Sequence, residues 1–250
     1  KNGYSGRNLP NETLGIDGID QGEPFNPRSS NSRSTMVSYA ARLDYTFASK
    51  YLLTLTYRAD ASSKFQDPWG YFPGAALGWN LDQEGFFKRA FPFLSTTKIR
   101  ASYGSTGNNR VGDFVRFPSL GQTLSGYSFN NSTPLQMVNV SNVGNLGLRW
   151  EKVNTTDLGI ELGAFDNRIT FEADVYNKFT TDLLLSAQLP TSTGFATATK
   201  NIGKLRNKGL ELTLNTVNFE KRNFSWSSNF NISFNRNTVE ELTYGQQAIL

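Results

Sequence analysis

The stretch SYAARLDYTFASKYLLTLTYRADASSKF, residues 38–65, contains two runs of about ten residues that each alternate between apolar and polar side chains. Residues 48–50 join the two runs. Because a β-strand sends successive side chains to opposite faces, each run has one apolar face and one polar, charged face. Aromatic residues lie at both ends of the apolar faces. The stretch therefore predicts a β-hairpin with two very different faces.

A hairpin of this kind fits two environments. In a soluble β-sandwich the apolar face packs into the core and the polar face contacts water. In a membrane β-barrel the apolar face contacts lipid, the aromatic residues mark the membrane interfaces, and the polar face lines the lumen. The hairpin alone is compatible with both, so the rest of the chain has to decide between them.

The composition excludes several classes of protein. The chain has 250 residues, of which 38% are hydrophobic, and its mean hydropathy is −0.43. It contains no run of about 18 apolar residues, which excludes a transmembrane helix, whereas a β-barrel needs apolar residues only at alternate positions. The chain has no Cys and no His, which excludes disulfides and removes the commonest general base and metal ligand. Lys and Arg are scattered, so we expect no nucleic-acid partner.

We also expect no enzyme activity, no cofactor and no metal site. Glu172 and Asp174 lie two residues apart on one strand face, a pair that a glycoside hydrolase could use in principle. A charged wall that pairs with Lys or Arg of neighbouring strands explains them better. The sequence has no phosphate-binding or dinucleotide-binding motif.

Six further stretches alternate in the same way, so the sequence predicts eight strands between residues 34 and 235. Residues 1–33 lack any periodicity and predict an extracellular loop, and residues 236–250 predict the start of another. Residues 81–96, which follow the third strand, predict one or two helical turns. The expected fold is thus all-β.

The lengths of the connections distinguish the two environments. Long connections are expected at about 107–148 and 179–207, whereas short turns follow the first, fifth and seventh strands. The long connections therefore lie at one end of the sheet, as in outer-membrane barrels with long extracellular loops and short periplasmic turns. The helical turns at 81–96 are the exception and predict a small periplasmic helix.

Charged residues within the strands point the same way. Glu161, Glu172, Asp174 and Glu211 lie in mid-strand on the polar parity. A dry core would impose several kcal/mol on each unpaired charge, whereas a hydrated lumen would not. We therefore favour a transmembrane antiparallel β-barrel segment over a soluble sandwich.

Five segments of the sequence resemble the SusC/RagA family of TonB-dependent outer-membrane transporters of the Bacteroidota, and they occur in the same order as in that family. Together they cover most of residues 38–235. The segments are YLLTLTYRADASSKF (51–65), WGYFPGAALGWNL (69–81), KIRASYGSTGNN (98–109), LRWEKVNTTDLGIELGAFDNRITFEADVYNKFTTDLLL (148–185) and KNIGKLRNKGLELTLN (200–215).

The resemblance implies a barrel of about 22 strands that is filled by an N-terminal plug. The eight strands would be part of its wall, with the plug and the TonB-contacting segment absent from this chain. The implied partners are the rest of the barrel, TonB (through the absent N-terminal part), a SusD-like surface lipoprotein that forms a lid, and outer-membrane lipid and lipopolysaccharide. The implied location is the outer membrane of a Gram-negative bacterium of the Bacteroidota type.

The implied function is import of oligosaccharides or peptides beneath the lipoprotein lid. One alternative keeps the fold and makes the barrel a structural or assembly subunit of a larger outer-membrane complex. A third possibility is a soluble, secreted β-sandwich that binds glycans.

Two groups of residues are candidates for contact with cargo, plug or lid. The first group faces the lumen and comprises the four mid-strand carboxylates together with Arg58, Asp60 and Lys64, although for Arg58 and Asp60 we favour a cross-strand charge network that fixes the wall. The second group lies in the long loop and comprises Phe114, Phe117, Tyr127 and Phe129, whose rings could stack on a sugar or pack against a lid. Four further aromatic residues are expected in the interfacial girdle: Trp69, Tyr71, Phe72 and Trp79.

Overall fold

The computed structural model describes residues 31–123 and 137–242, together with four two-residue strands near the N-terminus. The chain divides into two compact units, Lys1–Ser34 and Thr35–Leu250. In the first unit, β1 (Asn2–Gly3) pairs with β4 (Arg28–Ser29), and β2 (Gly6–Arg7) pairs with β3 (Glu23–Pro24).

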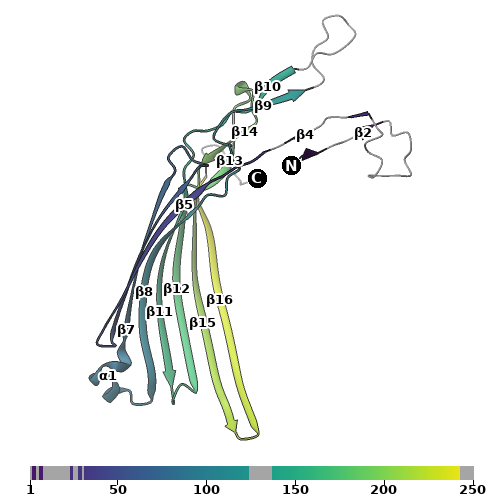
Figure 1. The fold of residues 1–250 in the computed structure, drawn as a ribbon. Coiled ribbons are helices and arrows are strands. Elements are labelled where there is room, and N and C mark those ends of the chain that lie inside the picture. Colours follow the sequence, from purple (N-terminus) through teal and green to yellow (C-terminus); the bar gives the residue numbers. More distant parts are fainter. Residues whose placement is uncertain are drawn as a thin grey trace, which may run out of the picture. The chain divides into compact units, whose positions relative to one another are not determined.

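The second unit is built on one antiparallel sheet of eight strands, in which each strand pairs with its neighbours in chain order (Figure 1). This confirms the all-β fold and the eight predicted strands. The other sheets among the described residues have two strands each, so none of them forms a sandwich with this one. The strands of the eight-stranded sheet are β5 (Met36–Phe47), β6 (Tyr51–Ser62), β7 (Trp69–Asn80), β8 (Leu94–Asn108), β11 (Glu151–Ala164), β12 (Ile169–Thr181), β15 (Lys204–Lys221) and β16 (Phe224–Glu241).

One face of this sheet, the apolar face, is made of hydrophobic side chains in register across all eight strands. Leu77 and Leu158, near the middle of the sheet, are 60% and 58% exposed. Such a large exposed apolar surface needs an apolar partner such as lipid or protein. One complete cross-strand row consists of Tyr45, Leu53, Leu77, Ala101, Leu158, Val175, Leu210 and Phe234.

Aromatic residues border the apolar face at both ends. At the end with the short turns, the short-turn end, Tyr51 stacks between Phe47 and Trp79. At the opposite, long-loop end, Trp69 stacks against Tyr39. Tyr39 and Phe47 lie eight residues apart on one strand, roughly 26 Å at the usual rise. With a strand tilt of about 40°, this length spans roughly 20 Å of membrane height, most of the lipid-facing band of about 25 Å in an outer-membrane barrel.

The helical segment predicted at 81–96 is present as η2 (Leu81–Gln83) and α1 (Gly85–Ala90). It lies at the short-turn end (Figure 1). Glu84, between the two helices, accepts hydrogen bonds from Lys50 Nζ at 2.8 Å, Tyr51 Oη at 3.1 Å and Trp79 Nε1 at 3.4 Å. These contacts tie the helix to the β5–β6 turn. Within the described ranges, no helix has the length and hydrophobicity needed to cross a membrane.

The Glu84 contacts predict a pH dependence at this end of the sheet. The hydrogen bond from Lys50 holds the pKa of the Glu84 carboxyl below its ordinary value. Because the folded-state pKa is depressed, the stabilisation is complete above the ordinary pKa of about 4.3 and is lost as the pH falls through the folded-state pKa. We expect the amides of Phe87 and Lys88, which donate to the Glu84 carbonyl, to lose hydrogen-exchange protection over that range. The measurement is exchange mass spectrometry corrected for intrinsic rates, and Glu84→Gln should abolish the pH dependence.

The two long connections differ from the plain loops that the sequence predicts. The first contains a hairpin of β9 (Ser119–Thr123) and β10 (Met137–Asn142). The second contains a hairpin of β13 (Leu184–Gln188) and β14 (Thr197–Asn201), with η3 (Thr191–Thr193) between its strands. Strand ends also differ, because β16 continues to Glu241, past the predicted end at residue 235. The four short strands of these hairpins have only five or six residues each, too few alternations to be recognised from sequence.

Candidate functional site

The opposite face of the sheet, the polar face, carries carboxylates on three neighbouring strands. Glu161 lies directly opposite Glu172, and Asp174 lies directly opposite Glu211. The structure therefore brings together the four carboxylates that the sequence singled out. Because like charges in cross-strand pairs destabilise a sheet, cations are needed beside them.

Arg100 of β8 supplies the main cation. Its Nη2 atom lies 2.6 Å from Asp174 Oδ2, and its Nη1 atom pairs with Glu161. Lys98 Nζ lies 3.7 Å from Glu161 Oε1. These four side chains are between 21% and 33% exposed, so the network lies at a partly hydrated surface and not in a dry core.

Gly159 allows Arg100 to reach Asp174. In the register of the sheet Gly159 lies directly between them, opposite Arg100 on β8 and Asp174 on β12. A Cβ atom at position 159 would overlap Arg100 and Asp174 side-chain atoms. Because glycine has no side chain, Gly159 leaves room on β11 for the ion pair between Arg100 and Asp174.

A Gly159→Ala substitution is expected to displace the Arg100–Asp174 bridge and lower the stability of the folded protein by about 1–3 kcal/mol, the usual cost of overpacking. Gly104→Ala is the matched control, because Gly104 lies on the same face and a Cβ there would meet nothing within 4 Å. The measurement is the thermal midpoint of the full-length protein in detergent. Equal midpoints for the two variants would contradict the role assigned to Gly159.

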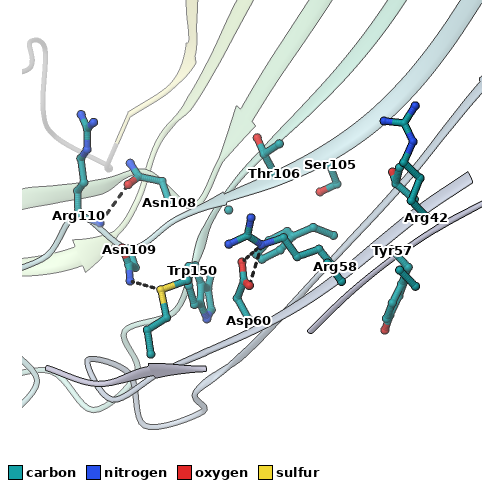
Figure 2. A pocket seen from close by; sticks show the side chains of 16 residues that line it. Arg42, Tyr57, Arg58, Asp60, Ser105, Thr106, Asn108, Asn109, Arg110 and Trp150 are labelled. Carbon is teal, nitrogen blue, oxygen red and sulfur yellow. Dashed lines mark hydrogen bonds and ion pairs between the residues drawn. The ribbon is translucent and has the colours of Figure 1, made fainter. Parts of the chain in front are cut away.

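A pocket of about 580 Å³ opens on the polar face at the long-loop end (Figure 2). Arg58 donates from Nε to both carboxylate oxygens of Asp60, at 2.8 and 2.9 Å, and Asp60 is only 5% exposed. This contact leaves the terminal nitrogens of Arg58 for other partners. Arg42 and Arg110 also line the pocket, as does Trp150. The pocket thus combines guanidinium groups with an aromatic ring, and it can bind a carboxylate or hydroxyl-rich ligand.

A small hydrophobic core, the long-loop cluster, lies beside the pocket. Its members come from the β6–β7 connection, from β7 and from both ends of the first long connection. The Trp150 ring lies 5.3 Å from the Phe65 ring and 5.6 Å from the Phe72 ring, and its Nε1 donates to the Pro68 carbonyl at 2.8 Å. The cluster consists of Phe65, Phe72, Val111, Leu148 and Trp150.

Phe72 corrects one sequence prediction. It was expected in the interfacial girdle with Tyr71, but it is only 4% exposed and belongs to the long-loop cluster. Adjacent strand residues face opposite sides, so Tyr71 and Phe72 cannot both lie on the apolar face. The Phe72 ring occupies the space above Gly107, where a Cβ would overlap it. Trp69 and Trp79 do lie on the apolar face, as expected.

Lys64 holds the start of the first long connection. Its Nζ donates to the Val111 carbonyl at 2.8 Å and lies 3.6 Å from Asp113 Oδ1. The structure therefore places Lys64 between two loops, beside the pocket and not among its lining residues. Contact with cargo or plug stays a prediction for this residue.

Phe114 and Phe117 lie on one turn of the same loop, where the Phe117 amide donates to the Phe114 carbonyl at 2.9 Å. Their side chains are 53% and 41% exposed. Phe114 has φ of +65°, a left-handed conformation that costs a bulky residue about 1–2 kcal/mol. Two exposed rings on a strained turn suit a binding surface. Tyr127 and Phe129 lie outside the described residues.

The second long connection is fastened to the first. Arg149 Nη2 lies 2.6 Å from Asp182 Oδ1, and Asn201 Nδ2 donates to the Arg149 carbonyl at 2.8 Å. Asn145 Nδ2 donates to the Thr199 carbonyl at 2.9 Å. The two long connections are therefore fastened to each other at this end of the sheet.

Sequence reasoning missed Arg100 and Trp150. Arg100 is recognisable from sequence only as a residue of the polar parity, because its role depends on the register of three strands. Trp150 precedes a strand and has no periodic neighbours that would mark it as buried. Within residues 31–123 and 137–242, no group of three or more Asp or Glu residues is placed to hold a metal ion.

Comparison with known proteins gives one family and several relatives. The family model described as TonB dependent receptor-like, beta-barrel matches residues 2–248. TonB-dependent receptor P39 of Formosa agariphila is 38% identical over 207 residues, which are 82% of this chain and 19% of that protein. TonB-dependent receptor SusC of Bacteroides thetaiotaomicron is 36% identical over 223 residues, 87% of this chain and 22% of SusC. The chain thus spans about a fifth of the length of these curated relatives.

Solved structures agree in fold. The RagAB peptide importer in its closed-closed state superposes with a TM-score of 0.80 at 24% identity, over 94% of this chain and 26% of the matched chain. The siderophore receptor PirA of Pseudomonas aeruginosa superposes with a TM-score of 0.52 at 16% identity, over 82% of this chain and 32% of that receptor.

Proposed function

The chain belongs to the TonB-dependent receptor β-barrel family, and on that premise we propose that it is part of the wall of a SusC-like importer in the outer membrane. The observation that carries the proposal is the two-faced sheet, with a continuous apolar row on one side and a hydrated charge network on the other. The apolar face would contact lipid, and the polar face would line the lumen. The soluble sandwich considered from sequence is wrong, because the eight long strands form one barrel-like sheet and the described residues contain no second large sheet.

The carboxylates of the polar face suit contact with a plug. Arg100 and Lys98 offset Glu161 and Asp174, whereas Glu172 and Glu211 face the same space from β12 and β15. A plug that presents Lys or Arg to these two carboxylates would be held against the wall by charge-assisted hydrogen bonds. Rearrangement of such contacts would accompany opening of the path when TonB pulls on the plug.

The long-loop pocket suits contact with cargo. Its guanidinium groups would bind the carboxylates and backbone carbonyls of a peptide, or the hydroxyls of a sugar. The cargo class is therefore an oligosaccharide or a peptide. The similarity to RagAB, which is described as a peptide importer, supports the second, and the similarity to SusC supports the proposed class of importer.

Phe114 and Phe117 would form part of the surface on which a SusD-like lipoprotein closes. They are exposed on a loop that is fastened to its neighbours, and exposed aromatic rings are common anchors at protein interfaces. A rigid surface of this kind loses little entropy when a lid docks on it.

The test is purification of the tagged full-length protein from membranes in mild detergent, followed by mass spectrometry of what accompanies it. The proposal predicts a polypeptide several times heavier than 27.8 kDa that brings a surface lipoprotein and bound oligosaccharide or peptide. Replacing Phe114 and Phe117 by Ser should reduce the lipoprotein recovered. A folded barrel that brings neither lipoprotein nor cargo would contradict import and favour a structural or assembly subunit.

A further inference from the structure

A row of three nitrogen donors crosses the outer wall at the long-loop end of β12, β15 and β16. Asn177 lies opposite Lys208, and Lys208 lies opposite Arg236. Their parity is that of Leu210 and Phe234, so all three side chains belong to the apolar face. Neighbouring strands are about 4.8 Å apart, so the three donors fall within roughly 10 Å.

The pair of cations in this row needs an explanation. Like charges directly opposite one another destabilise a sheet. In the described part of the chain, neither Lys208 nor Arg236 has a carboxylate within 4 Å, whereas the nearby Arg206 pairs with Glu240. Both cations are exposed, and the carboxylates of the eight described strands do not offset their repulsion. An external anion bound between the two cations would offset this repulsion.

The position of the row identifies the anion as part of a lipid. The apolar band of β16 runs from Trp226 to Phe234, which is roughly 26 Å at the usual strand rise, and Arg236 is the next residue on that face. Lys208 follows Leu210 in the same way on β15. The cations therefore lie just beyond the hydrocarbon band, at the level of lipid headgroups.

A hollow beside the row gives such a headgroup room. A pocket of about 520 Å³ is lined by Lys208 and Arg236 together with their apolar neighbours Val175, Leu210 and Phe234. A ligand there would find cations at one end and hydrocarbon at the other. An amphiphile with a phosphate at its headgroup has this distribution.

We propose that Lys208 and Arg236, with Asn177 beside them, bind a phosphate group of lipopolysaccharide lipid A. The choice of leaflet rests on the proposed function, in which the long loops are extracellular and the outer leaflet is lipopolysaccharide. Arg236 would bind two phosphate oxygens in a bidentate manner, and Lys208 would act as a point charge. The acyl chains would continue down the apolar face over Leu210 and Phe234.

The experiment uses full-length protein, delipidated in detergent, and native mass spectrometry with three probes: diphosphorylated lipid A, chemically dephosphorylated lipid A, and phosphatidylglycerol. We expect diphosphorylated lipid A to bind best. Each lost cation should weaken binding about fivefold, and K208Q/R236Q about 25-fold. The control K178Q/K200Q removes the same charge from the polar face and from β14, and it should bind like the wild type.

Thermal midpoints give a second readout that does not depend on binding in the gas phase. Without lipid, K208Q should be at least as stable as the wild type, because the substitution removes repulsion from Arg236. Diphosphorylated lipid A should then raise the wild-type midpoint more than that of the K208Q/R236Q variant. A purely structural role for Lys208 predicts the reverse order without lipid.

Equal binding of lipid A by the wild type and K208Q/R236Q, or equal binding of the dephosphorylated probe, would overturn the phosphate site. A cation-dependent preference for phosphatidylglycerol would overturn the choice of lipid A. The lipid-binding measurements do not depend on cargo or lid. A negative result for lipid A therefore leaves the import proposal standing, and a negative result for lipoprotein and cargo leaves the lipid A measurement valid.

Discussion

Leu77→Arg is expected to destabilise the folded barrel by about 1–3 kcal/mol, because the cost of an arginine on the lipid face rises from the aromatic girdle toward the bilayer midplane and Leu77 lies one apolar position inside the girdle residue Trp79. Leu77 is 60% exposed and lies in the complete apolar row, between Leu53 of β6 and Ala101 of β8. A new guanidinium there would have hydrocarbon on every side and no carboxylate partner. The measurement is reversible urea unfolding of full-length protein in phospholipid vesicles.

The matched control is Ala76→Arg, one residue earlier on the same strand. Ala76 pairs with Thr54 and Ser102 on the polar face, where an arginine would be hydrated. We expect its free energy of unfolding to change by less than about 1 kcal/mol, as for other solvated substitutions. If Ala76→Arg cost as much as Leu77→Arg, the two faces would not differ in environment, and lipid contact would be ruled out.

Trp150→Ala is expected to open the loops around the pocket. Trp150 is 4% exposed, contacts two aromatic rings of the long-loop cluster, and donates to the Pro68 carbonyl. Removing a buried Trp of this kind costs about 3–5 kcal/mol. Because the eight-stranded sheet remains paired, we expect the loss to appear as local opening and not as unfolding of the barrel.

Native-state hydrogen exchange measures this opening directly. The amides of Ser62 and Leu148, which donate to the carbonyls of Pro68 and Asn145, should exchange at least a hundredfold faster in Trp150→Ala. Mid-strand amides of β11 and β12 should keep their rates. Trp226→Ala is the control, because Trp226 stacks on Phe219 at the short-turn end. Unchanged exchange at Ser62 and Leu148 would show that Trp150 does not hold the loops together.

The eight strands could be predicted from sequence because period-two alternation is local. The run from Tyr51 to Asp60 shows its two faces without any knowledge of its neighbours, and so does the run from Ile169 to Tyr176. The same parity rule places Glu161, Glu172, Asp174 and Glu211 on one face. The parity rule also excludes Phe72 from the girdle once its neighbour Tyr71 is assigned to the girdle. The high aromatic content of the segment obscured this inference.

The contacts between strands could not be predicted in the same way. The bridge from Arg100 over Gly159 to Asp174 requires the register of three strands, and that register depends on a long connection whose length says little about how its ends align. Trp150 is buried by residues from the β6–β7 connection, 82 positions away in the case of Pro68. Long-range packing of this kind leaves no periodic pattern in the sequence.

The most direct test of a membrane-spanning wall is to determine which face of β7 contacts lipid. Nitroxide labels placed one at a time at Ala75, Ala76, Leu77 and Gly78 of the full-length protein in vesicles would report collisions with oxygen, which concentrates in hydrocarbon, and with a water-soluble nickel chelate. We expect strict alternation. The collision rate with oxygen should be high at Ala75 and Leu77 and low at Ala76 and Gly78. Equal access of the nickel chelate to all four positions would contradict a membrane-spanning wall.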